Sequence, residues 1–427
     1  MNQGKIGAFI AMLRKEKGYT QKEVANRLDL SEKTISKWEC GKGLPEVVYM
    51  EPLCSLLGIS VNELLIGERI PILELLKKMD ESRIELSTQL AFEQLKLRIY
   101  KLYGIEVDSV EMSDYGAGSL TYFIACKDQK YVVKYASENE MNHPETEPVV
   151  CAHLLKKGIP VSRFVKNRQG NVVSADENGR RFHVQCFIEG TVYDYNHAPK
   201  WLMHESAQML AKIHNALKDI TDLPVGIGAD YFKYRTPEAA LKRYQDTIQK
   251  AIANGDGMIA EEIRSNMRIL EHLPPYEFDI DRFTCTNTHG DYMITQLICG
   301  EDCINSVIDW TTACVHPIVW EIIRSYVYAS PLCADGEIDI TDFTDYVRTY
   351  LANGKLNFYD LDNMAQLFFY FTAVCDFYGQ YYDSLTKNRA VYLKQANLSS
   401  KLLRWFDVHV DELRKALREL AIENEIL

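Results

Sequence analysis

The sequence of 427 residues lacks any apolar run that approaches the roughly 20 residues a helix needs to cross a bilayer. Its N-terminus has neither a long apolar segment nor a small-residue cleavage site, so no secretory signal is expected. Cys residues number 11, which is odd, and no CxxC pair occurs among them. A complete disulfide framework is therefore not expected, and the thiols are predicted to be reduced and mostly buried. Together these absences predict a cytoplasmic protein without a membrane contact.

Internal repeats and low-complexity segments are also missing, and the length suits two or three domains of roughly 100–200 residues each. The net charge of −12 is unevenly distributed. Residues 1–60 carry nine Lys or Arg against seven Asp or Glu, which leaves 39 against 53 for the remainder. Because an acidic body repels phosphate, nucleic-acid binding is expected in the N-terminal segment if it occurs at all.

Residues 5–65 have the pattern of short helices separated by tight turns. Apolar residues recur at helical spacing from Ile6 to Leu13. Thr20 and Glu23 form a T-x-x-E capping box, and a second box is expected near residues 60–66. Ser31 is a candidate N-cap for a helix that runs to about Cys40.

This helix would be the recognition helix of a DNA-reading motif, with its outward side chains near base edges and phosphates. The stretch YTQKEVANRLDLSEKTISKWECGKGLP resembles the Cro/cI-type (Xre-like) helix-turn-helix family. The resemblance implies duplex DNA with an operator-like site as partner, and two half-sites favour a homodimer. The alternative is a small helical bundle for protein contact, whose polar face is an ordinary solvated surface. Glu32 agrees with this alternative, because its carboxylate would repel the phosphates of DNA. The candidate DNA-binding residues are Gln21, Lys33, Thr34, Ser36 and Lys37.

A long helical stretch, residues 67–105, follows, and it is predicted to be either a linker or dimer helix or a helix packed on the next domain. From residue 106 the pattern changes to short strands. Ser119–Cys126 and Tyr131–Tyr135 predict a hairpin, a helix follows near 147–157, and further strands are expected at 161–165, 172–173 and 183–188. Beyond residue 200 the chain is predicted to be largely helical, with one hairpin near 297–308.

Two features of the strand-rich segment suit phosphate binding. In the stretch 115–119, Gly116, Gly118 and Ser119 would let the backbone approach phosphate oxygens. Lys134 lies inside an apolar strand and needs an anionic partner if it is buried, which Glu147 at the next helix can supply. The alternative is an edge-strand lysine that faces water.

Further along, the sequence H-G-D is followed by a short hairpin and then by V-I-D-W. Asp291 would be the carboxylate that orients a substrate hydroxyl or takes its proton, and Asp309 at a strand end would bind a metal ion. Each motif alone is weak, but their order after Lys134 is specific.

Together these motifs resemble the aminoglycoside-phosphotransferase and choline-kinase-like families over about residues 106–420. The resemblance implies a protein-kinase-like fold that uses ATP or GTP with Mg²⁺. Lys134 would then bind phosphate, Glu147 would pair with it, Asp291 would be catalytic and Asp309 would bind Mg²⁺. The predicted fold class is an all-α helix-turn-helix domain followed by an α+β bilobal kinase-like domain. The predicted segments are 1–66, the linker 67–105, a small lobe with an antiparallel sheet at 106–190 and a mostly helical large lobe at 191–427.

One departure concerns the second metal ligand, because Gln296 stands where the family has Asn. Its longer arm suits the strict octahedral geometry of Mg²⁺ less well. Two functions therefore remain open: a regulator fused to a phosphotransferase acting on a small molecule that carries a hydroxyl or an amine, and a pseudo-kinase sensor that tunes DNA binding. A scaffold that uses both domains for protein contact is a third. Asp376 and Asp383, in an aromatic-rich helix, are either solvated or part of a pocket for a cation.

Overall fold

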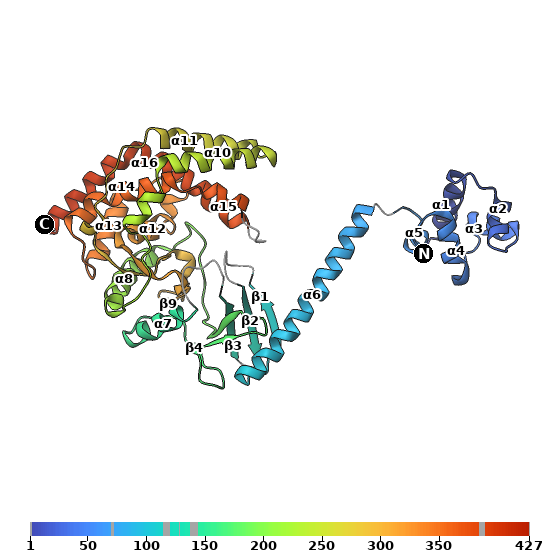
Figure 1. Ribbon diagram of the computed structural model, residues 1–427, viewed down its shortest axis with the longest axis horizontal. Helices are drawn as coiled ribbons and strands as arrows, with labels where there is room; N and C mark the ends of the chain where they lie inside the picture. The colour runs from blue at the N-terminus through green and yellow to red at the C-terminus, as the bar shows by residue number, and fades with distance from the viewer. Residues whose placement is uncertain are drawn as a thin grey trace. The chain divides into compact units, whose positions relative to one another are not determined.

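The computed structural model describes a chain of two compact units, Met1–Gln94 and Leu95–Leu427 (Figure 1). The first unit has one buried apolar cluster and the second has two, and none is shared between the units, so each unit is described by itself. The described residues are 2–69, 72–113, 120–127, 129–136, 144–383 and 389–426.

Short helices build the N-terminal unit, and the predicted capping residues begin several of them. The Thr20 side chain accepts a hydrogen bond from the backbone N–H of Glu23, whose carboxylate accepts from the backbone N–H of Thr20. Ser60 and Glu63 form an equivalent box, and Ser31 caps the third helix, so these local predictions are confirmed. The helices are α1 (Gln3–Glu16), α2 (Gln21–Arg27), α3 (Glu32–Glu39), α4 (Val47–Leu57) and α5 (Val61–Ile66).

A close contact between α1 and α3 organises the core of this unit. A Cβ atom on Gly7 would lie 2.3 Å from the carbonyl oxygen of Trp38, so a side chain at this position would push the two helices apart. Apolar side chains from α1, α3 and α4 fill the space around the contact. The fully buried members include Ile6, Ile10, Leu13, Ile35, Leu53 and Leu57.

The long helix α6 (Ile72–Tyr103) has 32 residues and would extend about 48 Å at 1.5 Å per residue. Leu95 and Ile99, near its C-terminal end, are buried among residues of the small-lobe sheet. Arg98 lies 2.5 Å from Glu177 of the same lobe. Of the two roles predicted for this helix, a linker or dimer helix and a helix packed on the next domain, the contacts of residues 95–99 agree with the second.

The small lobe is an antiparallel sheet with the order β1-β2-β3-β6-β4, in which β5 also pairs with β6. The predicted hairpin is present as β2 and β3, whereas β1 was not expected. Because β2 and β6 flank β3, Lys134 lies on an inner strand and the edge-strand alternative is wrong. The elements are β1 (Ser109–Met112), β2 (Thr121–Cys126), β3 (Gln129–Tyr135), α7 (Thr146–Lys156), β4 (Phe164–Val165), β5 (Val173–Ala175) and β6 (Arg181–Cys186).

The large lobe is mostly helical, as predicted, and its helices α8 to α16 form a layer separate from the sheet (Figure 1). Every side chain of α14 from Met364 to Val374 is buried, so the aromatic rings of this stretch belong to the core. The helices are α8 (Lys200–Ala216), α9 (Ala229–Tyr234), α10 (Pro237–Ala253), α11 (Gly257–Glu271), α12 (Ile318–Val327), α13 (Ile340–Leu351), α14 (Phe358–Val374), α15 (Phe377–Asp383) and α16 (Arg389–Glu423).

Short strands and 3-10 turns between α11 and α12 hold the polar motifs. The predicted hairpin is β8 (Leu297–Cys299) with β9 (Ile304–Val307), and β7 (Cys285–Thr288) pairs with β10 (Cys314–Pro317). The 3-10 turns of the second unit are η1 (Leu217–Asp219), η2 (Ile280–Arg282), η3 (Ile294–Gln296), η4 (Trp310–Thr312) and η5 (Pro331–Cys333), of which η2, η3 and η4 lie in this region.

No helix in the described part of the chain combines the length and the apolarity needed to cross a membrane.

Candidate functional site

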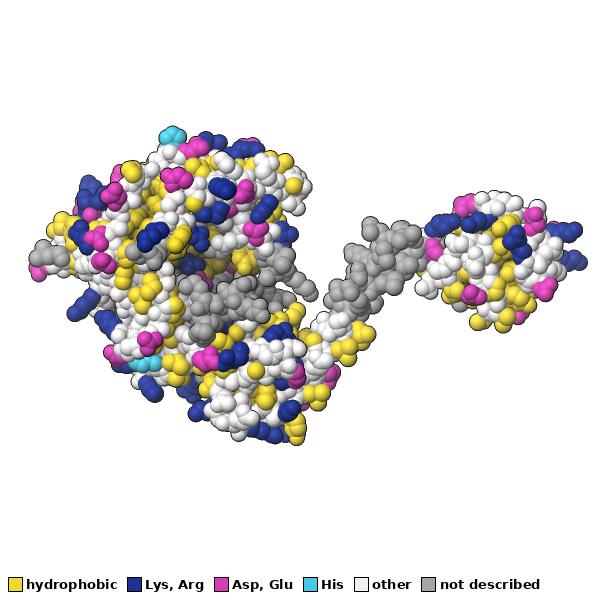
Figure 2. Space-filling model, in the orientation of Figure 1, with side chains coloured by type: hydrophobic (Ala, Val, Ile, Leu, Met, Phe, Trp, Pro, Cys, Tyr) yellow, Lys and Arg dark blue, Asp and Glu magenta, His cyan; other side chains and the backbone are white. Residues whose placement is uncertain are grey.

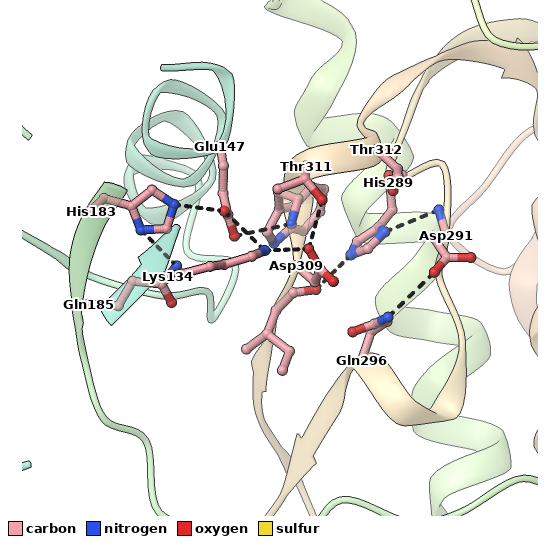
Figure 3. Close-up of polar contacts among 12 residues, drawn as sticks. Lys134, Glu147, His183, Gln185, His289, Asp291, Gln296, Asp309, Thr311 and Thr312 are labelled. Carbon is pink, nitrogen blue, oxygen red and sulfur yellow. Dashed lines mark hydrogen bonds and ion pairs between the residues drawn. The ribbon is translucent and has the colours of Figure 1, made fainter. Parts of the chain in front are cut away.

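The Lys134 ammonium lies between two carboxylates at the centre of the site (Figure 3). Its Nζ is 2.5 Å from Oδ1 of Asp309 and 3.4 Å from Oε2 of Glu147. Lys134 is only 8% exposed, because its neighbours Val133 and Tyr135 hold β3 in the core of the sheet. The expected pairing of Lys134 with Glu147 is therefore present, and Asp309 is a second partner of the same ammonium.

Glu147 is held in its ionised form by several donors. It begins the first turn of α7 and is 2% exposed. His183 Nε2 lies 3.1 Å from Oε2, and the backbone N–H of Trp310 donates to Oε1. Burial favours the neutral acid, but Lys134 and His183 outweigh it and lower the pKa of Glu147. His183 was not foreseen, although it is the cross-strand partner of Lys134.

Asp309 stands between β9 and η4 with a φ of 63°, in the left-handed region. The hydroxyl of Thr311 donates to its Oδ1 at 2.8 Å, and the side chain remains 40% exposed. Burial raises its pKa, but the neighbouring Lys134 ammonium more than compensates, so the pKa of Asp309 lies below its ordinary value. An ionised, partly accessible carboxylate results.

The H-G-D segment forms a tight loop beside Asp309. Gly290 has a φ of 83°, and a Cβ atom there would lie 1.9 Å from the carbonyl oxygen of Thr312, so only glycine fits. His289 Nε2 lies 2.9 Å from the carbonyl oxygen of Ile308, and its Nδ1 accepts from the backbone N–H of Asp291. These contacts fix the loop to the end of β9.

Glu321 of α12 is buried and holds the same loop in place by hydrogen bonds. Its carboxylate accepts from the backbone N–H groups of His289 and Tyr292, and it lies 2.9 Å from His214 Nε2. Burial opposes ionisation, but His214 and the other donors lower the pKa of Glu321 to about 2. Neither Glu321 nor His214 was predicted as a site residue, because they lie 107 positions apart and only the fold brings them together.

The carboxylate of Asp291 has two side-chain neighbours. Arg324 Nη1 lies 2.6 Å from Oδ1, and Gln296 Nε2 lies 3.4 Å from Oδ2. Burial works to lower the pKa of Arg324, but attraction to Asp291 raises it, so the guanidinium stays charged. With the Gln296 amide nitrogen toward Asp291, the amide oxygen is left for another ligand (Figure 3). Arg324 was also missed by the sequence reasoning.

A divalent cation at this site would depend on few protein ligands. Asp309 offers carboxylate oxygens and Gln296 an amide oxygen, the hard ligands that Mg²⁺ prefers. The described residues contain no cluster of three His, Cys, Asp or Glu side chains able to hold a metal ion. The side chains present therefore fit a cation that takes its remaining ligands from phosphates and water.

Other predicted residues have different positions. Gly116, Gly118 and Ser119 lie outside the described residues. Asp376 accepts from the Thr247 hydroxyl and the backbone N–H of Gly379, and Asp383 pairs with Lys250. The sequence left open whether these carboxylates are solvated or part of a pocket for a cation. Both have partners in the chain and Asp383 is exposed, so the structure gives no support to the pocket.

The candidate DNA-reading face is formed by α3 and the start of α2. Lys33 and Lys37 are exposed, whereas Thr34 and Ser36 are half-buried. Lys and Arg side chains stand out at the edge of this unit (Figure 2). Gln21 does not point freely outward, because its amide nitrogen donates to Glu39 at 2.7 Å.

Arg14 does not add a free charge to this face, because its guanidinium is bonded inside the unit. Its Nε and Nη2 donate to the two carboxylate oxygens of Glu39, and its Nη1 donates to the carbonyl of Tyr19. The hydrogen bond to Glu39 raises the pKa of Arg14. The pair therefore fixes α1 to α3.

Two family models match the chain: a helix-turn-helix model at residues 10–64 and the phosphotransferase enzyme family at residues 114–354. The HTH-type transcriptional activator BcrR of Enterococcus faecalis is 36% identical over 61 residues, which cover 14% of this chain and 30% of BcrR. The uncharacterised HTH-type transcriptional regulator y4dJ of Sinorhizobium fredii is 41% identical over 59 residues, which cover 14% of this chain and 77% of that protein. The chain thus spans less than a third of BcrR.

Solved structures share the fold of the second unit. A spectinomycin phosphotransferase in complex with ADP and spectinomycin has a TM-score of 0.50 at 15% identity, covering 77% of this chain and 98% of that chain. An amicoumacin kinase in complex with AMP-PNP and Ca²⁺ has a TM-score of 0.50 at 11% identity, covering 77% and 95%. A microcompartment-associated aminopropanol kinase has a TM-score of 0.51 at 14% identity, covering 75% and 98%. The chain belongs to the phosphotransferase enzyme family and carries an Xre-like helix-turn-helix domain at its N-terminus.

Proposed function

We propose that this protein is a cytoplasmic DNA-binding transcriptional regulator whose phosphotransferase domain binds a nucleotide with Mg²⁺ and phosphorylates a hydroxyl-bearing small molecule. The observation that carries the proposal is the position of the Lys134 ammonium between Glu147 and Asp309, beside the loop that bears Asp291 (Figure 3). Phosphoryl transfer needs a cation for the phosphates, a metal ligand and a carboxylate for the acceptor hydroxyl. Each of these has a candidate side chain in this cluster.

On the nucleotide side, Lys134 would bind the phosphates of ATP or GTP, while Glu147 keeps the ammonium in place. Phosphate oxygens would compete with Asp309 for Lys134 and leave that carboxylate, together with Gln296, for Mg²⁺. The loop with Gly116, Gly118 and Ser119 would cover the phosphates. Relatives of the same fold solved with ADP, or with AMP-PNP and Ca²⁺, support a nucleotide and a divalent cation.

On the acceptor side, Asp291 would orient the hydroxyl and take its proton. A bond forms between the acceptor oxygen and the terminal phosphorus, and the bond from that phosphorus to the bridging oxygen of the nucleotide breaks. The anchors of this loop, Glu321 and His289, would keep Asp291 at a constant distance from Asp309. The spectinomycin and amicoumacin kinases support a small molecule as the acceptor.

A sensor without catalysis is the second candidate, and two observations favour it. Gln296 replaces the Asn of the family, and the Asp291 carboxylate is already bonded to Arg324 and lies near the Gln296 amide. In this case nucleotide or small-molecule binding would change DNA affinity through a coupling between the two units.

For the N-terminal unit we propose that α3 enters the major groove of an operator-like site. Lys33, Thr34, Ser36 and Lys37 would contact bases or phosphates, and Gln21 would do so if its amide leaves Glu39. Two copies of the chain would bind two half-sites, since this arrangement gives such readers their affinity. The two regulators that match this segment, one of them an activator, support a role in transcription.

The test combines nucleotide binding with transfer, using the full chain. Calorimetry with ATP and GTP, with and without Mg²⁺, should detect binding that depends on Lys134. Radiolabelled phosphate transfer to a panel of alcohols should then be seen with the wild type and be lost in Asp291→Asn. Nucleotide binding without transfer would favour the sensor, and no nucleotide binding at all would contradict both candidates.

A further inference from the structure

A buried guanidinium lies directly against the carboxylate proposed to be catalytic. Arg324 projects from α12, one turn beyond Glu321, and its Nη1 is 2.6 Å from Oδ1 of Asp291. Its side chain is only 15% exposed. The loop anchor and this guanidinium therefore belong to the same helix, which fixes Arg324 relative to the reacting centre.

Within the described part of the chain, Asp291 is the one side-chain acceptor found for this guanidinium. A guanidinium carries five N–H donors in a planar fork. Among the residues that the structure describes, its polar partner is Asp291, and its other recorded contact is the ring of Tyr328, whose centroid is 5.8 Å from Cζ. None of its nitrogens is both fully buried and without a partner, and the side chain is 15% exposed, so donors that do not face Asp291 are accessible to a ligand. A second anion beside Asp291 would accept from them.

The neighbouring charges point to the same sign of ligand. The charges of Asp194, Asp291 and Arg324 all act on the Tyr195 hydroxyl. Asp194 accepts from the Lys394 ammonium and from the backbone N–H of Tyr195, and Asp291 pairs with Arg324 itself. Both carboxylates thus have a cationic partner in the chain. An acceptor with an ammonium group would find neither of them unpaired, whereas an anionic group would find the spare donors of Arg324.

We propose that Arg324 is the anion-recognising residue of the acceptor site, and that the acceptor is an alcohol with a carboxylate or phosphate group a few bonds from its hydroxyl. This inference rests on the proposed phosphotransferase function. One Nη group stays on Asp291, and the remaining donors of the fork take the acceptor's anion. Arg324 and the acceptor hydroxyl then both contact the Asp291 carboxylate. The position of the anion on Arg324 therefore determines which hydroxyl of the acceptor lies against Asp291.

The test uses matched alcohols that differ only in the anionic group: glycerol against glycerate and glycerol 3-phosphate, and 3-aminopropanol against homoserine. Transfer by the full chain should favour the anionic members, and the carboxylate and phosphate arms identify which anion is taken. Arg324→Gln should lower kcat/KM for the anionic member by on the order of 10- to 100-fold and bring the anionic-to-neutral ratio close to one. Arg324→Lys should retain part of this preference.

Two controls separate recognition from mere support of Asp291. Nucleotide binding and thermal unfolding of Arg324→Gln report whether the fold is intact, and Arg348→Gln on α13, whose guanidinium pairs with Asp345 and Glu423, should behave as the wild type. Equal loss on anionic and neutral acceptors would overturn the proposal, because a residue that only positions Asp291 affects both.

If no acceptor is phosphorylated, the same pairs are compared by ligand-induced thermal stabilisation with ADP and Mg²⁺ present. Stabilisation by the anionic members in the wild type, absent in Arg324→Gln, would support the anion site although the proposed catalysis had failed. Equal stabilisation within each pair, or none, would overturn it.

Discussion

Replacing Lys134 with Met should both destabilise the small lobe and abolish nucleotide binding. The substitution removes the cation that lies 2.5 Å from Asp309 and 3.4 Å from Glu147. Breaking a buried ion pair from one side typically costs about 3–5 kcal/mol. We expect a loss near the lower limit, about 3 kcal/mol, because Glu147 keeps the donors of His183 and Trp310 and because Asp309 is partly exposed.

Urea unfolding of the full chain, followed separately for the two units, measures this loss. The matched control is Lys130→Met, on the same strand, since the Lys130 ammonium forms a surface pair with Glu189 in which both side chains are more than half exposed. Such surface pairs contribute at most about 1 kcal/mol. Calorimetric titration with ATP and GTP in the presence of Mg²⁺ then reports the effect on the nucleotide.

The reasoning would be refuted if Lys134→Met were as stable as Lys130→Met and still bound nucleotide with wild-type affinity. Loss of binding without loss of stability would retain the role of Lys134 in the site but contradict the energetic argument from burial. Loss of stability with intact binding would mean that phosphates are held by other residues.

The remaining predictions concern both units. Lys37→Ala should weaken DNA binding and reduce its salt slope by about one unit, whereas Lys5→Ala, whose ammonium pairs with Glu68, should leave the slope unchanged; fluorescence anisotropy across salt concentrations checks both. If the domain transfers phosphate, Asp291→Asn should stop the transfer. Gln296→Asn should increase the transfer rate or strengthen Mg²⁺ binding, because the shorter arm restores the ligand geometry of the family. Wild-type transfer that disappears in Gln296→Asn would contradict this expectation. Burial lowers the pKa of His316 to about 4 in the folded chain, whereas an unfolded His has a pKa of about 6.5. As the pH falls from about 6.5 to 4, the unfolded chain therefore binds a proton at this residue that the folded chain does not bind. Stability should therefore fall in that window by about 3 kcal/mol from this group, and His316→Gln should flatten the pH dependence of the urea midpoint.

Features that depend on nearby residues could be predicted from the sequence. The capping boxes at Thr20 and Ser60 satisfy N–H groups three residues away, so their geometry follows from the local pattern. The β2–β3 hairpin and the pairing of Lys134 with Glu147 also join segments close in the chain. Here residue type and spacing were sufficient.

Features that depend on distant contacts could not be predicted in this way. Glu321 lies 107 residues from His214, and Arg324 is brought to Asp291 only by the packing of α12 beneath the loop. The strands β1, β7 and β10, of four residues each, are too short for a clear alternation of apolar residues. The pair of Arg14 with Glu39 is also of this kind, because nothing in the sequence of α1 indicates that a carboxylate of α3 binds Arg14.

The bond between Lys134 and Asp309 joins residues 175 positions apart in the chain. By contrast, the side-chain contacts among the described residues of the N-terminal unit join residues at most 63 positions apart, as in the pair of Lys5 with Glu68. During synthesis from the N-terminus, domains fold as units in the order in which they emerge. The helix-turn-helix domain can therefore complete its core on the ribosome long before β9 and η4 have been made. A chain that stops early would carry a finished helix-turn-helix domain without the Lys134–Asp309 cluster of the second unit.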